Sequence, residues 1–557
     1  MSTNIDQAEA TREPSNASPD VVEDASGADP VDYRFWLAFW SIALTNLAAA
    51  FDATTLSVAL PKISQALGGT STEAFWGGTS YLLATTAMML IWVSASDAVG
   101  RRAATLAALL VFGVGAIICA VATGWTAMLA GRTVQGVGGG GVIGLTAVLI
   151  TDLVPLRRRG KFYALISVVW AVGSPIGPII GGVLSQKDAW RWIFWMNLPI
   201  VGVGMLGIAA FLRLSRHRLT LVEMLGCFDY PGSFLFVASA TVLLIPLTWG
   251  GTQYPWSSWQ TLVPLILGVA GFAAFGCYEK WSQSRRPSKK LLIPLDIFSN
   301  YSALLLFGSS MLHGLVLYSF VYYMPEYFQT VKLYSPIIAG TVTIVPCAAF
   351  VSVVVGKTGQ YRWAIWAGWL LVSGGCGLLV LLDANTTVAQ WIFLQVVSGL
   401  GIGLLFPSIS LAVQSSVPER TVSVAATLVL FFRSMGQALG VAIGSAVLEN
   451  QLRQRLTKLI ASQPALDARR QTLDIMALAA LLKQLSRDNE FAVQAREAMA
   501  KSFQTIWIVL SVIAGACFLA MLPLKEYDMN RAHESTQKFQ HNRADQEKRG
   551  NVSKGQS

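Results

Sequence analysis

The sequence predicts an all-α polytopic membrane protein, and three observations carry this prediction. Hydrophobic residues make up 54% of the 557 residues and charged residues only 13%, whereas an ordinary soluble protein is about 25% charged. The apolar residues gather in runs of about 20 residues, the length that an α-helix needs to cross a bilayer. The loops between alternate runs are rich in lysine and arginine, which marks one side of the membrane as cytoplasmic.

Fourteen apolar runs are candidate spans, and their order divides the chain. They lie near 35–58, 75–95, 104–124, 126–150, 162–184, 192–212, 228–249, 260–279, 301–325, 336–356, 363–382, 388–411, 424–448 and 503–524. We expect a disordered cytoplasmic tail (1–34), a six-helix bundle (35–212), an inserted helix pair with a linker (213–300), a second six-helix bundle (301–524) and a cytoplasmic tail (525–557). The positive-inside rule places both termini in the cytoplasm. Residues 449–502 are then an extracellular loop, with helix near 469–500.

Two parts of the chain repeat one another when the sequence is shifted by 263 residues. Gly136 then falls on Gly399, and Gly177 falls on Gly440. The fourth and fifth spans therefore match the twelfth and thirteenth, as expected for two six-span halves separated by an inserted pair. Repeated halves are typical of transporters. Three of the matched positions that differ in residue type are Pro178 with Val441, Trp170 with Arg433 and Arg132 with Gln395.

The fifth span contains a run of regularly spaced glycines and two prolines, Gly173-Ser-Pro175-Ile-Gly177-Pro178-Ile-Ile-Gly181-Gly182. Glycine at every fourth position leaves one helix face bare, so that a neighbouring helix can approach closely. The prolines remove backbone donors and bend a helix. A closely packed, bent helix suits a moving part, and a static packing face is the alternative. Because valine replaces Pro178 in the repeat, we expect the moving part in the first half alone.

Seven motifs in order resemble those of the fourteen-helix drug:proton antiporters of the major facilitator superfamily, including fungal pumps for toxins and secondary metabolites. Among them are Asp52 to Pro61 in the first span, Asp97-Ala-Val-Gly100-Arg101-Arg102 after the second, Arg132 to Gly136 in the fourth, Gly173 to Gly182 in the fifth, and Trp190 to Pro199 before the sixth. The resemblance implies the major facilitator fold with 14 transmembrane helices, and export by exchange. Asp97, Arg101 and Arg102 are expected to latch two helices in one state, or else only to orient the chain.

Asp52 is the leading candidate for proton coupling, because a carboxylate inside a span suggests a function. Counted from the ends of their spans, Asp52 and Arg132 share a depth in the outer leaflet. We expect Asp52 to take up and release the proton while Arg132 modulates its affinity. The alternatives are a permanent structural ion pair and an aspartate that faces a watery vestibule.

Five further polar residues are candidates for a substrate cavity: Gln135, His313, Tyr322, Gln329 and Arg433. Arg433 lies near the middle of its span, where an unpaired charge is costly, and is expected to meet a substrate group or a cluster of carbonyls. The alternative is that it reaches toward the cytoplasm. His313 is a possible proton carrier, but a hydrogen-bonded structural histidine is the stronger expectation.

The sequence also lacks the motifs of several other functional classes. It contains no phosphate loop, no HExxH and no cysteine pair with metal spacing, so we expect no cofactor, no metal and no enzyme activity, with a proton gradient as the energy source. Its basic residues lie in short loops, which argues against nucleic acid as a partner. The expected partners are a small molecule, protons and lipid, and the chain is expected to be a monomer.

The leading function is proton-coupled export of small amphipathic organic molecules by alternating access. Uptake by symport or facilitation uses the same fold, and a receptor that binds without moving its ligand is a third possibility. The expected location is the plasma membrane, with a vacuolar or vesicle membrane as the alternative.

Overall fold

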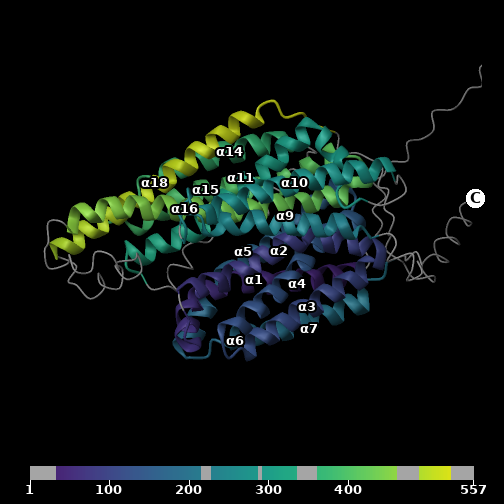
Figure 1. Cartoon of the computed structure of the whole chain (residues 1–557). Coiled ribbons are helices and arrows are strands. Elements are labelled where there is room, and N and C mark those ends of the chain that lie inside the picture. Colours follow the sequence, from purple (N-terminus) through teal and green to yellow (C-terminus); the bar gives the residue numbers. More distant parts are fainter. Residues whose placement is uncertain are drawn as a thin grey trace, which may run out of the picture.

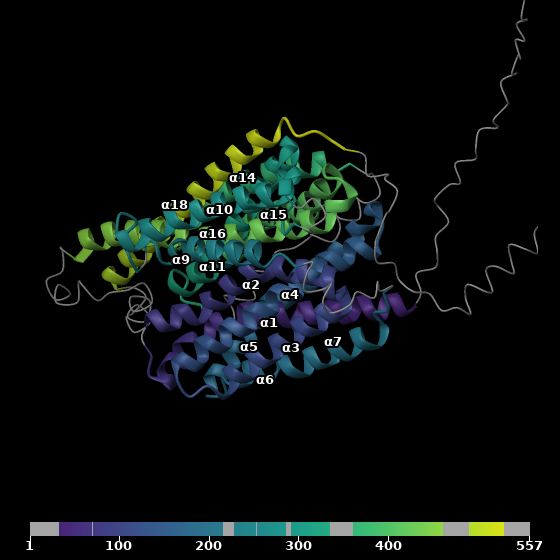
Figure 2. The ribbon, with the colours of Figure 1, turned by 45° about the vertical axis from the view of Figure 1, so that its right-hand side comes forward.

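The computed structural model describes residues 33–69, 71–214, 228–251, 253–285, 291–334, 360–460 and 489–527. Over these ranges the protein is helical and has no strand, apart from an isolated bridge between Gly250 and Tyr254. Two lobes lie side by side in both views, one purple to blue and the other teal to yellow (Figures 1 and 2). The all-α class is therefore confirmed.

The first lobe contains the N-terminal helices. These are α1 (Tyr33–Leu67), α2 (Ser71–Val99), α3 (Arg101–Val121), α4 (Trp125–Leu153), α5 (Leu156–Gln186), α6 (Trp192–Trp195) and α7 (Asn197–Phe211). Short α6 and longer α7 together occupy the predicted sixth span. α1 packs along α5, while α4 packs against both α2 and α3. The helix α4 is thus central to the lobe, and side chains of the neighbouring helices can contact it.

The second lobe contains the remaining helices. The inserted pair is α9 (Tyr230–Trp249) and α10 (Trp259–Arg285), followed by the short η1 (Leu295–Ser299). The other elements are α11 (Tyr301–Thr330), α14 (Arg362–Leu379), α15 (Val388–Ser416), η2 (Glu419–Thr421), α16 (Val422–Ile460) and α18 (Glu490–Met521). α9 contacts α2 as well as α16, so the inserted pair lies along the seam between the two lobes.

Twelve stretches of the described chain are long and apolar enough to cross a membrane. The predicted span 363–382 is also helical, as α14, but is not among these twelve. The predicted span 336–356 lies outside the described residues. A polytopic membrane protein is confirmed, while the count of fourteen spans stays a prediction.

The segment 449–502 differs from the loop that the sequence suggested. α16 continues to Ile460 and α18 already begins at Glu490, so both flanks of the segment extend the neighbouring helices. The reason is that a helix does not end where its apolar run ends, since polar residues with good helix propensity carry it into water. Most of the predicted helix 469–500 lies outside the described residues, and the sidedness of the segment stays a prediction.

The packing of the two lobes agrees with the predicted repeat. α1 lies along α5 in the first lobe, and α11 lies along α16 in the second. Likewise α3 pairs with α4, and α14 pairs with α15. The start of α1 and the end of α18 lie toward the same end of the molecule in both views (Figures 1 and 2). By the positive-inside assignment this is the cytoplasmic end.

Candidate functional site

Asp52 of α1 lies at the centre of a buried polar network. Its side chain is 1% exposed. One carboxylate oxygen accepts a hydrogen bond from Arg132 Nη1 of α4 at 2.5 Å. The other accepts from Gln135 Nε2 at 2.8 Å and from Asn197 Nδ2 of α7 at 3.2 Å. The structure thus brings together the two residues that the sequence singled out for proton coupling, together with Gln135.

Arg132 is held from several sides. Its Nε donates to the backbone oxygen of Gly77 at 3.1 Å, and its Nη1 also donates to Gln135 Oε1 at 2.8 Å. The guanidinium carbon lies 4.5 Å from the centroid of the Tyr81 ring on α2. Arg132 and Gln135 are three residues apart on α4, so they face the same neighbours. The network therefore joins four helices, α1, α2, α4 and α7.

The three donors around Asp52 come from two other helices. Arg132 and Gln135 of α4 and Asn197 of α7 all donate to its carboxylate oxygens. Protonation of Asp52 would replace one acceptor site by an O–H donor and would remove the charge that Arg132 pairs with. The network therefore links the charge on Asp52 to the contacts of α1 with α4 and α7.

One contact of the network was not predicted from the sequence. Asn197 was recognised only as part of the motif before the sixth span, and its contact with Asp52 joins residues 145 positions apart. The apolar part of α1 ends at Leu56, close to the predicted span end at residue 58, although the helix itself runs on to Leu67. α4 begins at Trp125, seven residues before Arg132, so the pairing of Asp52 with Arg132 agrees with the predicted depths.

A second charged cluster lies where α2, α3 and α4 meet at the predicted cytoplasmic end. Arg101 is 4% exposed and pairs with Asp97 at 2.7 Å and with Asp152 of α4 at 2.8 Å. Gly100, between α2 and α3, has a φ of 97°, a conformation that residues with a side chain rarely adopt. Arg102 donates to the backbone oxygen of Ala209 near the end of α7. The segment from Asp97 to Arg102, between α2 and α3, thus contacts both α4 and α7 and holds four helices together.

The described polar contacts between the two lobes lie at this same end. Ser423 at the start of α16 donates to Asp152 at 3.2 Å. Arg159 of α5 donates to Gln414 Oε1 of α15 at 3.0 Å and lies 3.5 Å from Glu419 of η2. The Gln414 amide in turn donates to the Tyr163 hydroxyl at 3.1 Å. We call these residues (Asp152, Arg159, Tyr163, Gln414, Glu419 and Ser423) the cytoplasmic latch.

The latch was not foreseen. The sequence analysis did not single out Arg159, although its side chain is 1% exposed and reaches the other lobe. Arg159 and Gln414 are 255 positions apart, and no local pattern connects them. The three-arginine run Arg157-Arg158-Arg159 therefore does more than orient the chain.

The glycine face of α5 packs against α1, as the spacing of its glycines suggested. A Cβ atom added to Gly177 would lie 2.1 Å from Thr54 Oγ1. α5 remains helical through Pro175 and Pro178, and Gly173, Gly181 and Gly182 are buried. That the moving part lies in the first half alone stays a prediction. A Cβ atom at Gly440 would lie 2.2 Å from the Leu315 backbone oxygen, so the second half is packed equally closely.

The five candidates for a substrate cavity do not lie together. Gln135 belongs to the Asp52 network. Arg433 and His313 both lie against the Phe406 ring in the second lobe. Tyr322 is 38% exposed and stacks on Tyr318 with the ring centroids 6.1 Å apart. Gln329 is half-buried near the outer end of α11, about 24 Å along the helix from His313.

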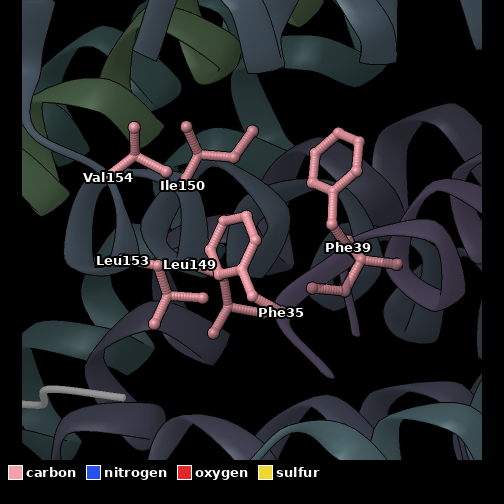
Figure 3. Close-up of a pocket in the computed structure, with 7 residues that line it drawn as sticks. Phe35, Phe39, Leu149, Ile150, Leu153 and Val154 are labelled. Carbon is pink, nitrogen blue, oxygen red and sulfur yellow. The ribbon is translucent and has the colours of Figure 1, made fainter. Parts of the chain in front are cut away.

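A small apolar groove at the cytoplasmic end is a separate feature (Figure 3). It lies between α1 and α4, and its lining side chains are Phe35, Phe39, Ile42, Leu149, Ile150, Leu153 and Val154. None of the predicted site residues lines it, and it offers no polar group to a ligand. No cluster of three metal-ligating side chains occurs in the described ranges.

The family model described as Major Facilitator Superfamily matches residues 42–441. A protein named MFS transporter L2, from Phoma sp., is 42% identical over 506 residues, which cover 89% of this chain and 83% of that protein. Efflux pump FUS6 from Gibberella moniliformis is 38% identical over 433 residues, covering 76% of each chain. MFS-type efflux pump LUC4 from a Fusarium species is 39% identical over 432 residues, again covering 76% of each.

Solved structures agree on the fold. The human organic anion transporter MFSD10 superimposes with a TM-score of 0.53 at 12% sequence identity, covering 87% of this chain and 98% of that one. The proton:xylose symporter XylE superimposes with a TM-score of 0.53 at 13% identity, covering 90% and 98%. At such identities the likeness concerns the fold alone.

Proposed function

The chain belongs to the major facilitator superfamily, and from that premise we propose that it exports small amphipathic organic molecules in exchange for protons. It is a multi-pass membrane transporter and not an enzyme. What the proposal adds is the coupling ion, the direction and the kind of substrate.

The single observation that carries proton coupling is the buried contact between Asp52 and Arg132 at 2.5 Å. A carboxylate inside a membrane protein can take up a proton when its environment changes. In the described state three side chains donate hydrogen bonds to this carboxylate. We propose that protonation from the outer side releases Arg132, and that deprotonation toward the cytoplasm restores the pair.

Alternating access is supported by the placement of the cytoplasmic latch. Polar contacts across the two lobes, such as Arg159 with Gln414, hold the cytoplasmic ends together. We propose that this arrangement is the outward-facing state, in which substrate leaves and a proton enters. The opposite state requires these contacts to break, because the lobes must separate where they now touch.

The direction of transport is proposed from two sources. Relatives with 38% and 39% identity are named efflux pumps. The Gly173 to Gly182 motif in α5 resembles the motif of exchangers, and its glycine face packs closely on α1, the helix that carries Asp52. Export of this kind places the protein in the plasma membrane.

The test uses inside-out membrane vesicles from yeast cells that express the chain, with a panel of fluorescent amphipathic molecules of each charge. Acidifying the vesicle lumen should drive at least one of them inward, and a protonophore should abolish the accumulation. Vesicles without the protein serve as the control. Accumulation that requires an acidic outside instead would identify a symporter and overturn the proposal.

A further inference from the structure

Four arginine side chains in the described part of the chain are almost fully buried: Arg101, Arg132, Arg159 and Arg433. The first three have the carboxylate partners given above. Arg433 of α16, which is 4% exposed, has no carboxylate partner among the described residues. Its Nε and Nη2 atoms are buried without a hydrogen-bond partner there. An unpaired charge at this depth is costly, so a counter-charge is expected.

The described helices of the second bundle offer few carboxylates near this place. α14 and α15 contain no aspartate or glutamate, and neither does the sequence of residues 335–359. In α11 the single acidic residue is Glu326, about 20 Å along the helix from His313. In α16 it is Glu449, about 24 Å along the helix from Arg433. Because no described carboxylate pairs with Arg433, a bound molecule is the source of counter-charge that we pursue.

The surroundings of Arg433 have the composition of a binding site. Its guanidinium carbon lies 3.9 Å from the centroid of the Phe406 ring. The His313 ring lies 6.5 Å from the same ring at 62°. His313 Nε2 lies 3.1 Å from the backbone oxygen of Ile402, so this nitrogen carries the hydrogen. His313 Nδ1 is left as an acceptor, buried and without a partner in the described chain.

We propose that Arg433, His313 and Phe406 form the substrate site for an acidic amphipathic molecule. The carboxylate of the substrate supplies the missing counter-charge and accepts hydrogen bonds from Arg433. A hydroxyl of the same molecule can donate to His313 Nδ1, and its apolar body packs on Phe406. This inference rests on the proposed transport function and deepens it by naming the charge of the substrate.

The test measures thermal unfolding of the purified full chain in detergent. The probes are phenylalkanoates from phenylacetate to 8-phenyloctanoate, each compared with its alcohol and its amine. At least one carboxylate should raise the melting temperature of the wild type more than its matched alcohol and amine do. Arg433→Met should weaken that binding about tenfold or more, because it removes hydrogen bonds to a charged group. Arg433→Lys should retain part of it.

Unfolding without any probe gives an independent answer. If Arg433 lacks a partner, Arg433→Met should leave the melting temperature unchanged or raise it, whereas the matched variant Arg101→Met should lower it. A lower melting temperature for Arg433→Met would mean that the protein itself pairs this charge, and would overturn the proposal. So would equal effects of carboxylate, alcohol and amine, or no effect of any probe.

Transport separates this inference from the function on which it rests. Proton-driven export of the alcohols but not of the carboxylates would support the proposed export function and refute the proposed site for an acidic substrate. Selective, Arg433-dependent binding of carboxylates without proton-driven flux would support the site and refute the exporter.

Discussion

Replacing Asp52 by asparagine keeps the shape of the side chain and removes the counter-charge of Arg132. The wild-type carboxylate accepts from Arg132, Gln135 and Asn197 at 2.5, 2.8 and 3.2 Å. An amide has one acceptor oxygen and an NH2 donor, so at least one of these donors then faces another donor. Breaking a buried ion pair from one side costs about 3–5 kcal/mol. We therefore expect Asp52→Asn to lower the melting temperature and to abolish proton-driven accumulation in inside-out vesicles.

A second variant separates coupling from stability. In Asp52→Asn combined with Arg132→Gln, neither buried charge remains, and two amides can bond to each other. Because loss of both partners is far less costly than loss of one, the double variant should melt above Asp52→Asn. It should still fail to couple flux to the pH gradient, since neither side chain titrates in the physiological range.

Two measurements decide the matter. Proton-driven flux and substrate counterflow are compared in the wild type and both variants at equal protein content. We expect counterflow to persist in the double variant, since counterflow needs no proton. Proton-driven flux that survives in Asp52→Asn would remove Asp52 from the mechanism. A double variant that melts below Asp52→Asn would contradict the view that Asp52 and Arg132 stabilise one another.

Three further predictions concern packing, the latch and an outer loop. Gly177→Leu and Gly440→Leu should both block transport. An added Cβ atom would lie 2.1 Å from Thr54 Oγ1 in the first variant and 2.2 Å from the Leu315 backbone oxygen in the second. Normal flux in either variant, measured in the same vesicles, would contradict this packing. Asp152→Asn weakens the ion pair with Arg101 at 2.8 Å. A cysteine introduced beside the latch should then react faster with a reagent added from the cytoplasmic side, and unchanged labelling would contradict the latch. Burial alone would raise the pKa of Asp383, but hydrogen bonds from Thr386 and Asn385 and the nearby Lys332 lower it. Its contribution to loop order is then complete above the ordinary carboxyl pKa and is lost as pH falls through the lowered value. The protection factor of the Asn385 amide, which corrects for the slower intrinsic exchange in acid, should therefore fall on acidification more than it does in Asp383→Asn.

The sequence predicted the centre of the site because depth in a membrane can be counted. Asp52 and Arg132 were assigned a common depth from the ends of their apolar runs, and the two side chains meet at 2.5 Å. The count succeeded although α1 continues to Leu67, since the membrane-spanning parts of α1 and α4 are what align. The repeat was also visible, because glycines that allow close approach recur at a fixed spacing.

What the sequence did not show depends on contacts between distant segments. Asn197 reaches Asp52 from α7, and Arg159 reaches Gln414 across the two lobes, in each case over more than a hundred positions. The equal packing at Gly177 and Gly440 was also missed, because a proline in one copy says little about the distance to the facing helix. The helix α16 ends at Ile460, beyond the predicted span, because hydropathy indicates which residues lie in the membrane and not where the helix ends.

A physical route from proton to latch follows from α4 alone. Arg132 lies near one end of this helix and Asp152 lies near the other, about 30 Å apart along the axis. Arg132 contacts Asp52, while Asp152 contacts Arg101 and accepts from Ser423 of the other lobe. We propose that α4, which packs closely on α2 and α3, moves as one body, so that release of Arg132 at the outer end would change the position of Asp152 at the inner end. Proton uptake at Asp52 and opening of the cytoplasmic latch would then be two consequences of one displacement.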